Sequence, residues 1–363
     1  MATQKRKFDY VIGNPPYNAS GIINNYGVHR IYYEALGLGG KHGSLAFAMK
    51  GVDYLKNNGK LLYIIPTNGM VLKNSIGFRN YISSSSSITY TWVTNKDVFR
   101  NKRTNKLEAC IQGNTFIIEI IKNKNEDCLV ETEYSNGLSF KTKTNYSEYN
   151  NQYFPLVLSK LTESAMNKVI NKDCIKLSDI LNKGAMHNSI KNDVINLDKQ
   201  EDTDIKVMVK LNRGENIKYG WTSIDEGEYR NLYKVVFSPI CKIKEIYQYG
   251  KISTAIIPSG TSVQANYSYF RATTQDEANF IQKYLQHPLV IISTAQLFDN
   301  AYINNSNLGR LGIPPFKDLD DITEYVWNYF DITDDEKKEV ESIYNLILMT
   351  EKSQMKKHSN EEN

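Results

Sequence analysis

The tetrapeptide Asn14-Pro15-Pro16-Tyr17 is the segment whose residue types are best suited to chemistry. Two prolines fix their φ angles and remove two backbone donors, so the loop is rigid and its carbonyl oxygens stay free to accept hydrogen bonds. The Asn14 side chain adds an amide oxygen that also accepts. These oxygens can hold both protons of one exocyclic amine and turn its lone pair out of the ring, while Tyr17 offers a π-face to the ring. The segment therefore suits methylation of an amino group on a flat heterocycle; a plain turn is the alternative.

The position of this tetrapeptide favours the chemical interpretation over the plain turn. It follows a mostly apolar run, residues 8–12, that predicts a strand. Apolar residues at helical spacing predict a helix over 44–56, and residues 60–65 predict a second strand, which together make a βαβ unit. Ligands of open α/β sheets bind at the carboxyl ends of strands, which is where the tetrapeptide lies. Two further strands are predicted over 88–93 and 107–121.

Composition sets the broad class of the protein. The chain has 363 residues, of which 41% are hydrophobic and 23% charged, which is typical of a globular protein and excludes wholesale disorder. The net charge is only +4, so nothing but a local cluster of basic residues could indicate nucleic-acid binding. No apolar run is long enough to predict a membrane span. The four cysteines are widely spaced, which predicts no zinc or other metal site and fits a reducing cytoplasm.

Changes in composition along the chain predict its domain organisation. Residues 1–124 read as a partial doubly wound α/β domain, similar to half of a Rossmann-like sheet. The polar stretch 125–153 reads as a linker. Residues 154–316 mix short strands, among them 205–211, 233–237, 251–257 and 267–272, with a helix over 275–285, which predicts an α+β domain. Residues 317–363 predict C-terminal helices and a solvated tail.

The sequence Phe-Asp-Tyr-Val-Ile-Gly-Asn-Pro-Pro-Tyr-Asn, residues 8–18, resembles the (D/N/S)-P-P-(Y/F/W) catalytic motif of S-adenosylmethionine-dependent amino-methyltransferases. The Asn-Pro-Pro-Tyr form is most typical of N6-adenine DNA methyltransferases of bacterial restriction–modification systems. The segments that follow are similar to the family in the same order: the helix over 44–59, the strand over 60–66 and the Leu-Arg-x-Tyr-Leu-like helix over 78–82. The chain is accordingly expected to act on double-stranded DNA in the cytoplasm of a bacterial or phage-infected cell.

The resemblance implies a role for each residue of the motif. Asn14 and the Pro15 carbonyl would hold the amine of a flipped adenine, and Pro16 would keep the loop rigid. Tyr17 and the more loosely matched Phe99 would stack on the base. S-adenosylmethionine would donate the methyl group.

The region after residue 154 resembles the target-recognition domains of fused and type II restriction–modification methyltransferases. Its basic residues alternate with aromatic ones, a pattern that can bind phosphates and bases. A small basic loop also follows Phe99, close to the expected pocket. The candidate DNA contacts are Lys102, Arg103, Lys106, Arg213, Lys218 and Arg271.

The methyl-donor motif of the family, Phe-x-Gly-x-Gly, is not found in the sequence, although it lies upstream of Asn-Pro-Pro-Tyr in this class. The glycine-rich segment 37–43 lacks the acidic-ended strand that should follow such a motif and reads better as a loop over the substrate. We therefore expect a second polypeptide to supply the donor half, and the strand over 8–12 to be left as an exposed apolar edge. A shortened, inactive gene product is the other reading.

Two other functions remain open at this point. A catalytically inactive DNA-binding specificity or assembly subunit would explain the missing donor motif. A protein glutamine N5-methyltransferase uses the same tetrapeptide to grip a side-chain amide, but that class is compact and lacks a long recognition region. No residue pattern supports a metal-dependent endonuclease, which needs converging carboxylates.

Overall fold

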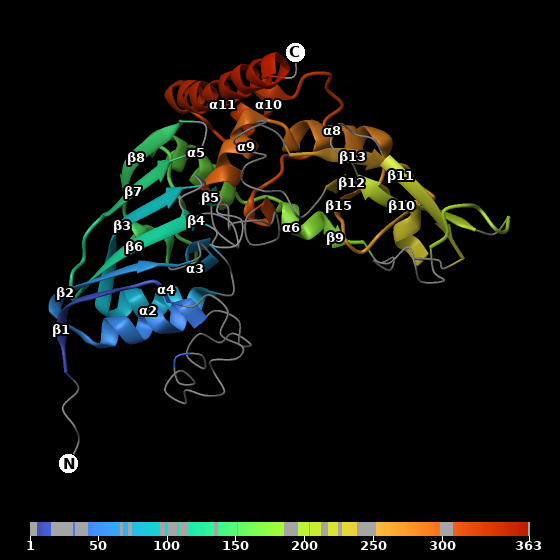
Figure 1. Cartoon of the computed structure of the whole chain (residues 1–363). Helices are drawn as coiled ribbons and strands as arrows, with labels where there is room; N and C mark the ends of the chain where they lie inside the picture. The colour runs from blue at the N-terminus through green and yellow to red at the C-terminus, as the bar shows by residue number, and fades with distance from the viewer. Residues whose placement is uncertain are drawn as a thin grey trace. The chain divides into compact units, whose positions relative to one another are not determined.

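The computed structural model (Figure 1) forms two compact units, which are Met1–Glu163 with Gln296–Ala301, and Ser164–Ala295 with Tyr302–Asn363. The structure describes residues 6–15, 32, 43–65, 68–71, 75–94, 99–100, 107–108, 115–133, 137–150, 152–184, 195–202, 204–211, 217–223, 227–237, 252–297 and 308–361.

The first unit is built on a six-stranded mixed sheet in the order β1-β2-β6-β3-β7-β8. Its strands are β1 (Phe8–Gly13), β2 (Leu55–Ile64), β3 (Ser86–Thr94), β6 (Thr115–Lys122), β7 (Cys128–Glu133) and β8 (Ser139–Thr144). β1 and β2 are parallel, as are β3 and β7, whereas β6 is antiparallel to both of its neighbours and β8 is antiparallel to β7. The predicted α/β class is confirmed, with a sheet of mixed direction.

The predicted βαβ unit is present as β1, α2 (Gly43–Asp53) and β2. The apolar positions of α2 that set its helical spacing, including Leu45, Met49 and Val52, are fully buried. The helix ends at Asp53, before the predicted end at residue 56, because β2 already begins at Leu55. The sequence Asn57-Asn58-Gly59 lies within β2. Gly59 is required there, since a Cβ would lie 2.9 Å from the Lys56 carbonyl oxygen and 3.0 Å from that of Phe8.

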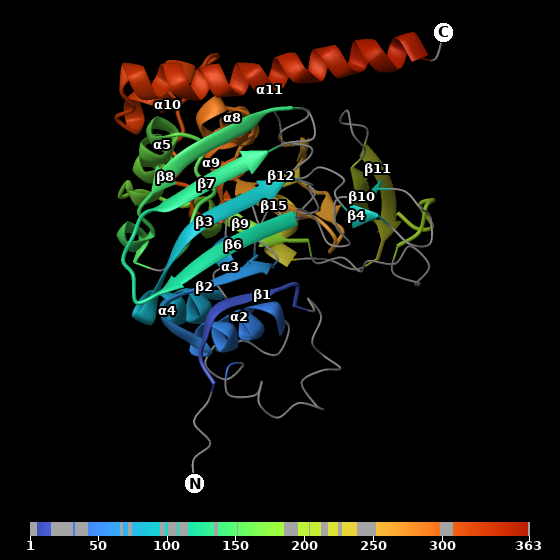
Figure 2. The same ribbon diagram turned by 60° about the vertical axis from the view of Figure 1, so that its left-hand side comes forward.

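One face of this sheet is much better covered than the other. α2 and α4 (Ile76–Ser85) lie side by side, with α2 against β2 and α4 against β3 (Figures 1 and 2). Alternate residues of the strands, among them Leu61 and Ile120, are fully buried. On the opposite face Tyr10, Ile12 and Leu62 are 67%, 73% and 38% exposed. Large apolar side chains are therefore left open to solvent at the β1 end of the sheet.

The predicted linker over 125–153 is wrong, because this stretch contains β7, β8 and the short helix η2 (Tyr146–Tyr149). In β7 buried and half-buried residues alternate strictly, with Cys128, Val130 and Thr132 inside. Because Cys128 is small and Thr132 is polar, the alternation of buried residues in β7 gives only a weak alternation of hydropathy in the sequence. Residues 154–163 also belong to the first unit rather than to the second.

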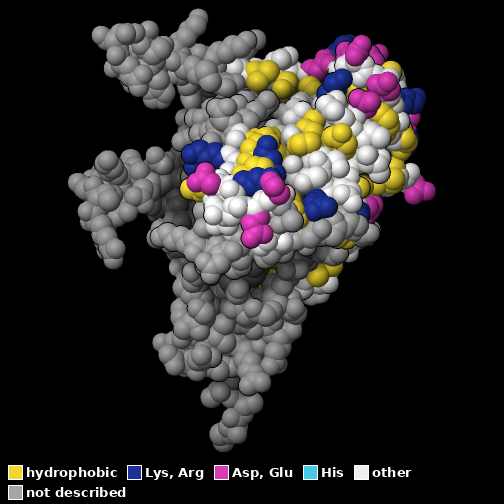
Figure 3. All heavy atoms as spheres, turned by 90° about the vertical axis from the view of Figure 1, so that its right-hand side faces the viewer, with side chains coloured by type: hydrophobic (Ala, Val, Ile, Leu, Met, Phe, Trp, Pro, Cys, Tyr) yellow, Lys and Arg dark blue, Asp and Glu magenta, His cyan; other side chains and the backbone are white. Residues whose placement is uncertain are grey.

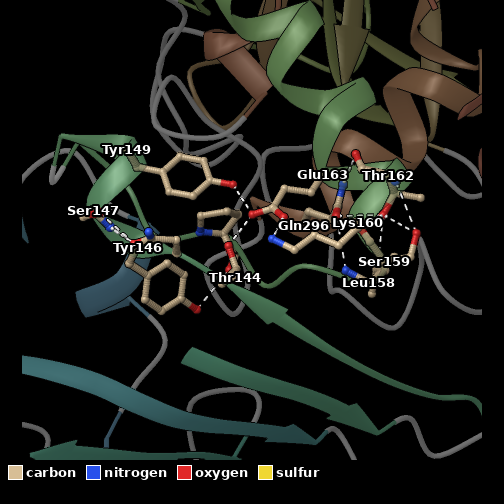
Figure 4. Close-up of polar contacts among 12 residues, drawn as sticks. Thr144, Tyr146, Ser147, Tyr149, Leu158, Ser159, Lys160, Thr162, Glu163 and Gln296 are labelled. Carbon is tan, nitrogen blue, oxygen red and sulfur yellow. Dashed lines mark hydrogen bonds and ion pairs between the residues drawn. The ribbon is translucent and has the colours of Figure 1, made fainter. Parts of the chain in front are cut away.

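A buried carboxylate joins the end of this sheet to the helix α5 (Lys160–Asn171), as Figure 4 shows. Glu163 accepts hydrogen bonds from the Thr144 and Tyr149 hydroxyls and from Lys160 Nζ at 2.8 Å. Gln296 forms a second set of hydrogen bonds at the start of α5: its Oε1 accepts from the Leu158 amide at 3.2 Å and from the Thr162 hydroxyl at 3.1 Å. These bonds explain why the segment from Gln296 groups with the first unit.

The second unit holds a three-stranded sheet, β11-β10-β14, and a four-stranded sheet, β13-β12-β15-β9. Their strands are β9 (Leu181–Lys183), β10 (Ile205–Leu211), β11 (Ile217–Thr222), β12 (Tyr233–Phe237), β13 (Thr254–Ile257), β14 (Ser262–Val263) and β15 (Ser268–Ala272). Its helices are α6 (Leu177–Ile180), α8 (Gln275–Leu285), α9 (Pro288–Gln296), α10 (Thr323–Tyr329), α11 (Asp334–Glu361) and the larger part of α5. The predicted strands 205–211 and 233–237 and the helix 275–285 are confirmed.

The C-terminal helices are part of the second unit and not a separate segment after residue 316. Trp327 of α10 and Val340 of α11 are buried. The α5 side chains Ser164 and Lys168 donate hydrogen bonds to the buried Glu336 carboxylate of α11, at 2.6 and 2.7 Å. α11 runs through most of the predicted solvated tail, as far as Glu361.

We predict that Glu163→Ala lowers the free energy of unfolding by about 2–4 kcal/mol, because it leaves two buried hydroxyls without their shared acceptor. Denaturant titration followed by circular dichroism measures this loss. The matched control is Glu148→Ala, at an exposed position of η2. An equal, small effect of the two substitutions would contradict the role given to Glu163.

Candidate functional site

Asn14 and Pro15 lie directly after β1, at the carboxyl end of the parallel β1–β2 pair, where the sequence predicts them. Pro15 is buried and Asn14 is exposed. The Asn14 side chain is therefore accessible to a ligand, while the proline beside it is fixed by packing. Pro16 and Tyr17 lie outside the described residues, so their part in the site stays a prediction.

The close pairing of β1 with β2 fixes the position of Asn14. Val11 pairs with Leu61 and Gly13 pairs with Tyr63. A Cβ on Gly13 would lie 3.2 Å from the Tyr63 ring, so glycine lets this ring pack against the last residue of the strand. Burial raises the pKa of Tyr63. The neutral ring therefore serves as a wall beside the strand end.

Asp53, the last residue of α2, anchors two tyrosines at the amino end of the β1–β2 pair, opposite the end at which Asn14 lies. Tyr32 donates a hydrogen bond to Asp53 Oδ2 at 2.6 Å, and Tyr81 of α4 donates one to Oδ1. Burial, and then the Asp53 carboxylate, raise the pKa of both tyrosines. Tyr32 therefore contacts the end of α2, and its ring centre lies 6.3 Å from that of Tyr81 in α4.

Arg79 is a supporting residue whose role the sequence does not show. It is fully buried in α4, and its Nη1 donates to the carbonyls of Gly69 at 3.0 Å and Met70 at 3.2 Å. Its Nη2 donates to the Gln152 carbonyl at 2.7 Å, and its guanidinium lies 5.9 Å from the Phe154 ring. It therefore holds α3 (Asn68–Val71), which follows the carboxyl end of β2, in place. The sequence resemblance predicts the helix over 78–82, which is part of α4. Only the structure shows which carbonyl groups the Arg79 guanidinium binds.

Among the other candidate residues of the first unit, the structure describes only the backbone of Phe99. Phe99 is in β4 (Phe99–Arg100), which pairs with β5 (Leu107–Glu108), and its backbone lies opposite Glu108. Lys102, Arg103 and Lys106 lie outside the described residues. Base stacking by Phe99 and phosphate contacts by the basic loop therefore stay predictions.

In the second unit, basic and aromatic side chains lie together on β10, β11 and the segment before them. Lys206 Nζ is 3.9 Å from the centre of the Tyr219 ring, and Lys199 Nζ is 5.7 Å from that of Trp221. The exposed Lys218 pairs with Lys210 across the strands. On the face drawn in Figure 3, basic side chains lie among hydrophobic ones.

Two basic residues of the second unit donate hydrogen bonds to backbone carbonyls of the same unit. Arg271 Nη2 donates to the Asp179 carbonyl at 2.6 Å. Lys234 belongs to the same basic and aromatic pattern, but it is fully buried and its Nζ donates to the Thr261 carbonyl at 2.9 Å. Arg213 lies outside the described residues. Of the predicted DNA contacts of this unit that the structure describes, Lys218 is exposed and Arg271 is half-buried.

Neither a metal centre nor a membrane span is found in the described part of the chain. No three potential metal ligands gather there. None of its helices is both long and apolar enough to cross a bilayer.

The fold is thus a mixed α/β sheet in which Asn14 and Pro15 follow the first strand of a βαβ unit and β6 is antiparallel to both of its neighbours. Residues 1–99 match the family model described as Eco57I restriction-modification methylase. This part of the chain is therefore similar to the restriction–modification methylases, as the resemblance drawn from residues 8–18 predicts. No curated protein matches the chain.

Among solved structures the chain is similar to the Type IIL restriction-modification enzyme MmeI in complex with DNA, with TM-score 0.55 and 8% identity over 93% of this chain and 53% of that one. It also matches the type IIG restriction endonuclease BpuSI, with TM-score 0.37 and 11% identity over 95% and 54%. A third match is the Type ISP restriction-modification enzyme LlaGI, with TM-score 0.44 and 10% identity over 92% and 41%. The likeness to MmeI supports the fold alone, and the chain spans about half the length of these proteins or less.

We predict that Tyr81→Phe lowers the free energy of unfolding by about 1 kcal/mol, because Asp53 loses one of its two tyrosine hydrogen bonds. Because the pKa of Tyr81 is raised in the folded protein, the difference in stability between the variant and the wild type depends on pH. The difference from the wild type should be constant below pH 10.0, the ordinary tyrosine pKa, and should shrink above it as the hydroxyl ionises in the unfolded chain. Thermal unfolding at several pH values, with the exposed Tyr10→Phe as control, measures both; a difference that grows above pH 10 would refute the assignment.

Proposed function

We propose that this protein is the catalytic and DNA-recognition part of a site-specific DNA adenine-N6 methyltransferase of a restriction–modification system. The observation that carries the proposal is Asn14-Pro15 at the carboxyl end of β1, within the residues that match the methylase family. The exposed Asn14 amide leaves its oxygen available to an amine, and the buried Pro15 fixes the carbonyl beside it.

In the proposed reaction the Asn14 side-chain oxygen and the Pro15 carbonyl accept hydrogen bonds from the two protons of the adenine amine. They orient the nitrogen lone pair toward the methyl group, which S-adenosylmethionine supplies when bound. Tyr17 and Phe99 stack on the extruded base, because the target amine is shielded inside a duplex and the base must leave the stack. The chain thus contributes orientation and electrostatic stabilisation rather than a strong base.

Duplex DNA is the proposed substrate and binds through the second unit. Lys199, Lys206, Lys210 and Lys218 on and beside β10 and β11 present positive charge next to the Tyr219 and Trp221 rings. Such a surface attracts phosphates and offers aromatic faces to bases. The basic loop at Lys102, Arg103 and Lys106 is a second proposed phosphate contact.

A second polypeptide that carries the donor half is the proposed partner, and the two edges of the sheet support this. At one edge β8 has lysines at 141 and 143, which discourage pairing with another strand. At the other edge β2 is the one strand paired with β1 among the described residues, and Phe8, Tyr10 and Ile12 are 44%, 67% and 73% exposed. An open, apolar edge strand next to the reacting amine is where a donor-binding half would add its own strand.

A DNA-binding subunit without activity is the second candidate, favoured by the absence of Phe-x-Gly-x-Gly from the sequence. Glutamine N5-methylation is disfavoured by the large second unit. Methylation assays of the chain with and without a donor-half polypeptide separate these functions, because the inactive subunit would bind DNA under both conditions and methylate it under neither.

Asn14→Ala is predicted to reduce methyl transfer at least 100-fold, on the scale of removing one transition-state hydrogen-bond partner. DNA affinity should stay within about twofold, because it depends mainly on phosphate contacts. Transfer of a labelled methyl group by the active assembly measures the reaction rate. Fluorescence anisotropy of a labelled duplex measures the DNA affinity. Lys218→Ala is the converse control, expected to weaken DNA binding and its salt dependence. Wild-type transfer by Asn14→Ala would overturn the site.

The open β1 edge is predicted to make the isolated chain self-associate and to leave its S-adenosylmethionine binding weak or absent. Ile12→Lys should reduce self-association, because a charge on an edge strand opposes pairing. Light scattering measures the association and calorimetry the donor binding. Ile175→Lys, at an apolar position that is 59% exposed in the second unit, is the control. A monodisperse wild-type monomer that binds the donor tightly would contradict this arrangement.

A further inference from the structure

A bulge interrupts the antiparallel pairing of β10 with β11. Met208 lies opposite Tyr219, but the next pair is Lys210 with Lys218, so Val209 is an extra residue in β10. An extra residue of this kind bends the strand and changes the face on which the following side chains lie. The bulge therefore decides which side chains of β10 can meet those of β11.

The bulge brings two lysines, Lys210 and Lys218, together on one face of the two strands; they are called the lysine pair below. In a regular strand Lys206 and Lys210, four positions apart, would lie on the same face. Because of the extra residue, Lys210 lies directly opposite Lys218 and on the other face from Lys206. Directly opposite residues have their Cβ atoms about 4.5–5.5 Å apart, so two flexible lysine stems can bring both ammonium groups to one small ligand.

The lysine pair carries two positive charges without a counter-charge. Both side chains are exposed, and neither forms an ion pair within the part of the chain that the structure describes. On the same face of β10, Val207 and Val209 pack with Ile195 in a small apolar cluster. Like charges at directly opposite positions destabilise a sheet. A bound anion would offset this repulsion.

The other lysines of this surface already have partners. Lys199 forms an ion pair with Asp202 at 3.1 Å, and Lys206 Nζ lies 3.9 Å from the centre of the Tyr219 ring. Asp202 and Asp204 come just before β10, at the end of the strand away from the lysine pair. An anion is repelled from that end, so the lysine pair is the part of this surface best suited to bind one.

We propose that the lysine pair holds one phosphate group of the backbone of duplex DNA between its two ammonium groups. A phosphodiester has one negative charge and two non-bridging oxygens, so each ammonium donates to one oxygen. The Tyr219 and Trp221 rings lie on the opposite face of β11, so the pair contacts the backbone and not a stacked base. Such a contact positions the DNA and does not read its sequence. The inference rests on the proposed DNA substrate and assigns a phosphate contact to two residues.

Fluorescence anisotropy of a labelled duplex, titrated with the full-length chain at several salt concentrations, tests the proposal. Lys210→Gln and Lys218→Gln remove the charge and keep the length of the side chain, and each should weaken binding by about threefold or more at low salt. The logarithm of the binding constant falls with the logarithm of the salt concentration, with a slope of about −0.9 for each neutralised phosphate. The double variant should therefore reduce the magnitude of this slope by about 0.9, which corresponds to one phosphate.

The alternative results are distinct from one another. A reduction of the slope by about 1.8 would mean that the two lysines contact separate phosphates, and would overturn the shared contact. Wild-type affinity and slope in the double variant would refute this contact alone. Failure of the wild-type chain to bind duplex DNA would refute the contact together with the proposed substrate.

Controls separate a phosphate contact from sequence reading and from a role in the fold. The double variant should weaken binding by the same factor for a G·C-rich and an A·T-rich duplex; a loss with only one of them would indicate a base contact and overturn the proposal. Lys317→Gln, at an exposed lysine 4.4 Å from the Tyr325 ring centre, should leave DNA binding unchanged. Without DNA, Lys218→Gln should unfold at a temperature no lower than the wild type, because the repulsion within the pair is removed. A clearly lower temperature would trace the loss of binding to the fold and contradict the assignment.

Discussion

The parallel pairing of β1 with β2 is the interaction on which the proposed chemistry depends. It begins at the hydrogen bond from the Phe8 amide to the Tyr54 carbonyl, at 2.8 Å, and runs to the pair Gly13–Tyr63. Because the two strands are parallel, their carboxyl ends lie at one edge, and Asn14 emerges there beside a buried proline. A slip of one residue would reverse every side chain of β1 and turn Val11 away from the covered face.

Among the residues that the structure describes, β1 has one neighbouring strand, β2, and forms the edge of the sheet. The exposed Tyr10 and Ile12 lie on the less covered face of the sheet, so the β1 edge and the face beside it are both accessible to solvent. Pairing of two copies through β1 would fill the edge but leave that face uncovered. A strand followed by a covering helix protects both at once, which is the form that a donor-binding half of an α/β sheet would take.

Local patterns let the sequence predict β1, α8 and the place of Asn14. Each depends on residues close together in the chain: a continuous apolar run for β1, a helical pattern over 275–285 for α8, and the Pro15-Pro16 pair after the strand for Asn14. The strands β7 and β8 were missed because their alternation involves threonine and lysine rather than strong apolar residues. Contacts between distant segments, such as Leu158 with Gln296 or Arg79 with Gln152, leave no local signal. The pairing of Lys210 with Lys218 leaves none either, because it depends on the bulge in β10.

The central claim is that the Asn14 motif methylates the amine of adenine in DNA. Its most direct test is to incubate duplex DNA with S-adenosylmethionine, this chain and a polypeptide that carries the donor half, then digest the DNA to nucleosides and identify the products by mass spectrometry. The proposal predicts N6-methyldeoxyadenosine, and none when Asn14→Ala replaces the wild-type chain. A methylated cytosine, or a methylated glutamine in a protein added to the mixture with the DNA unmodified, would contradict it.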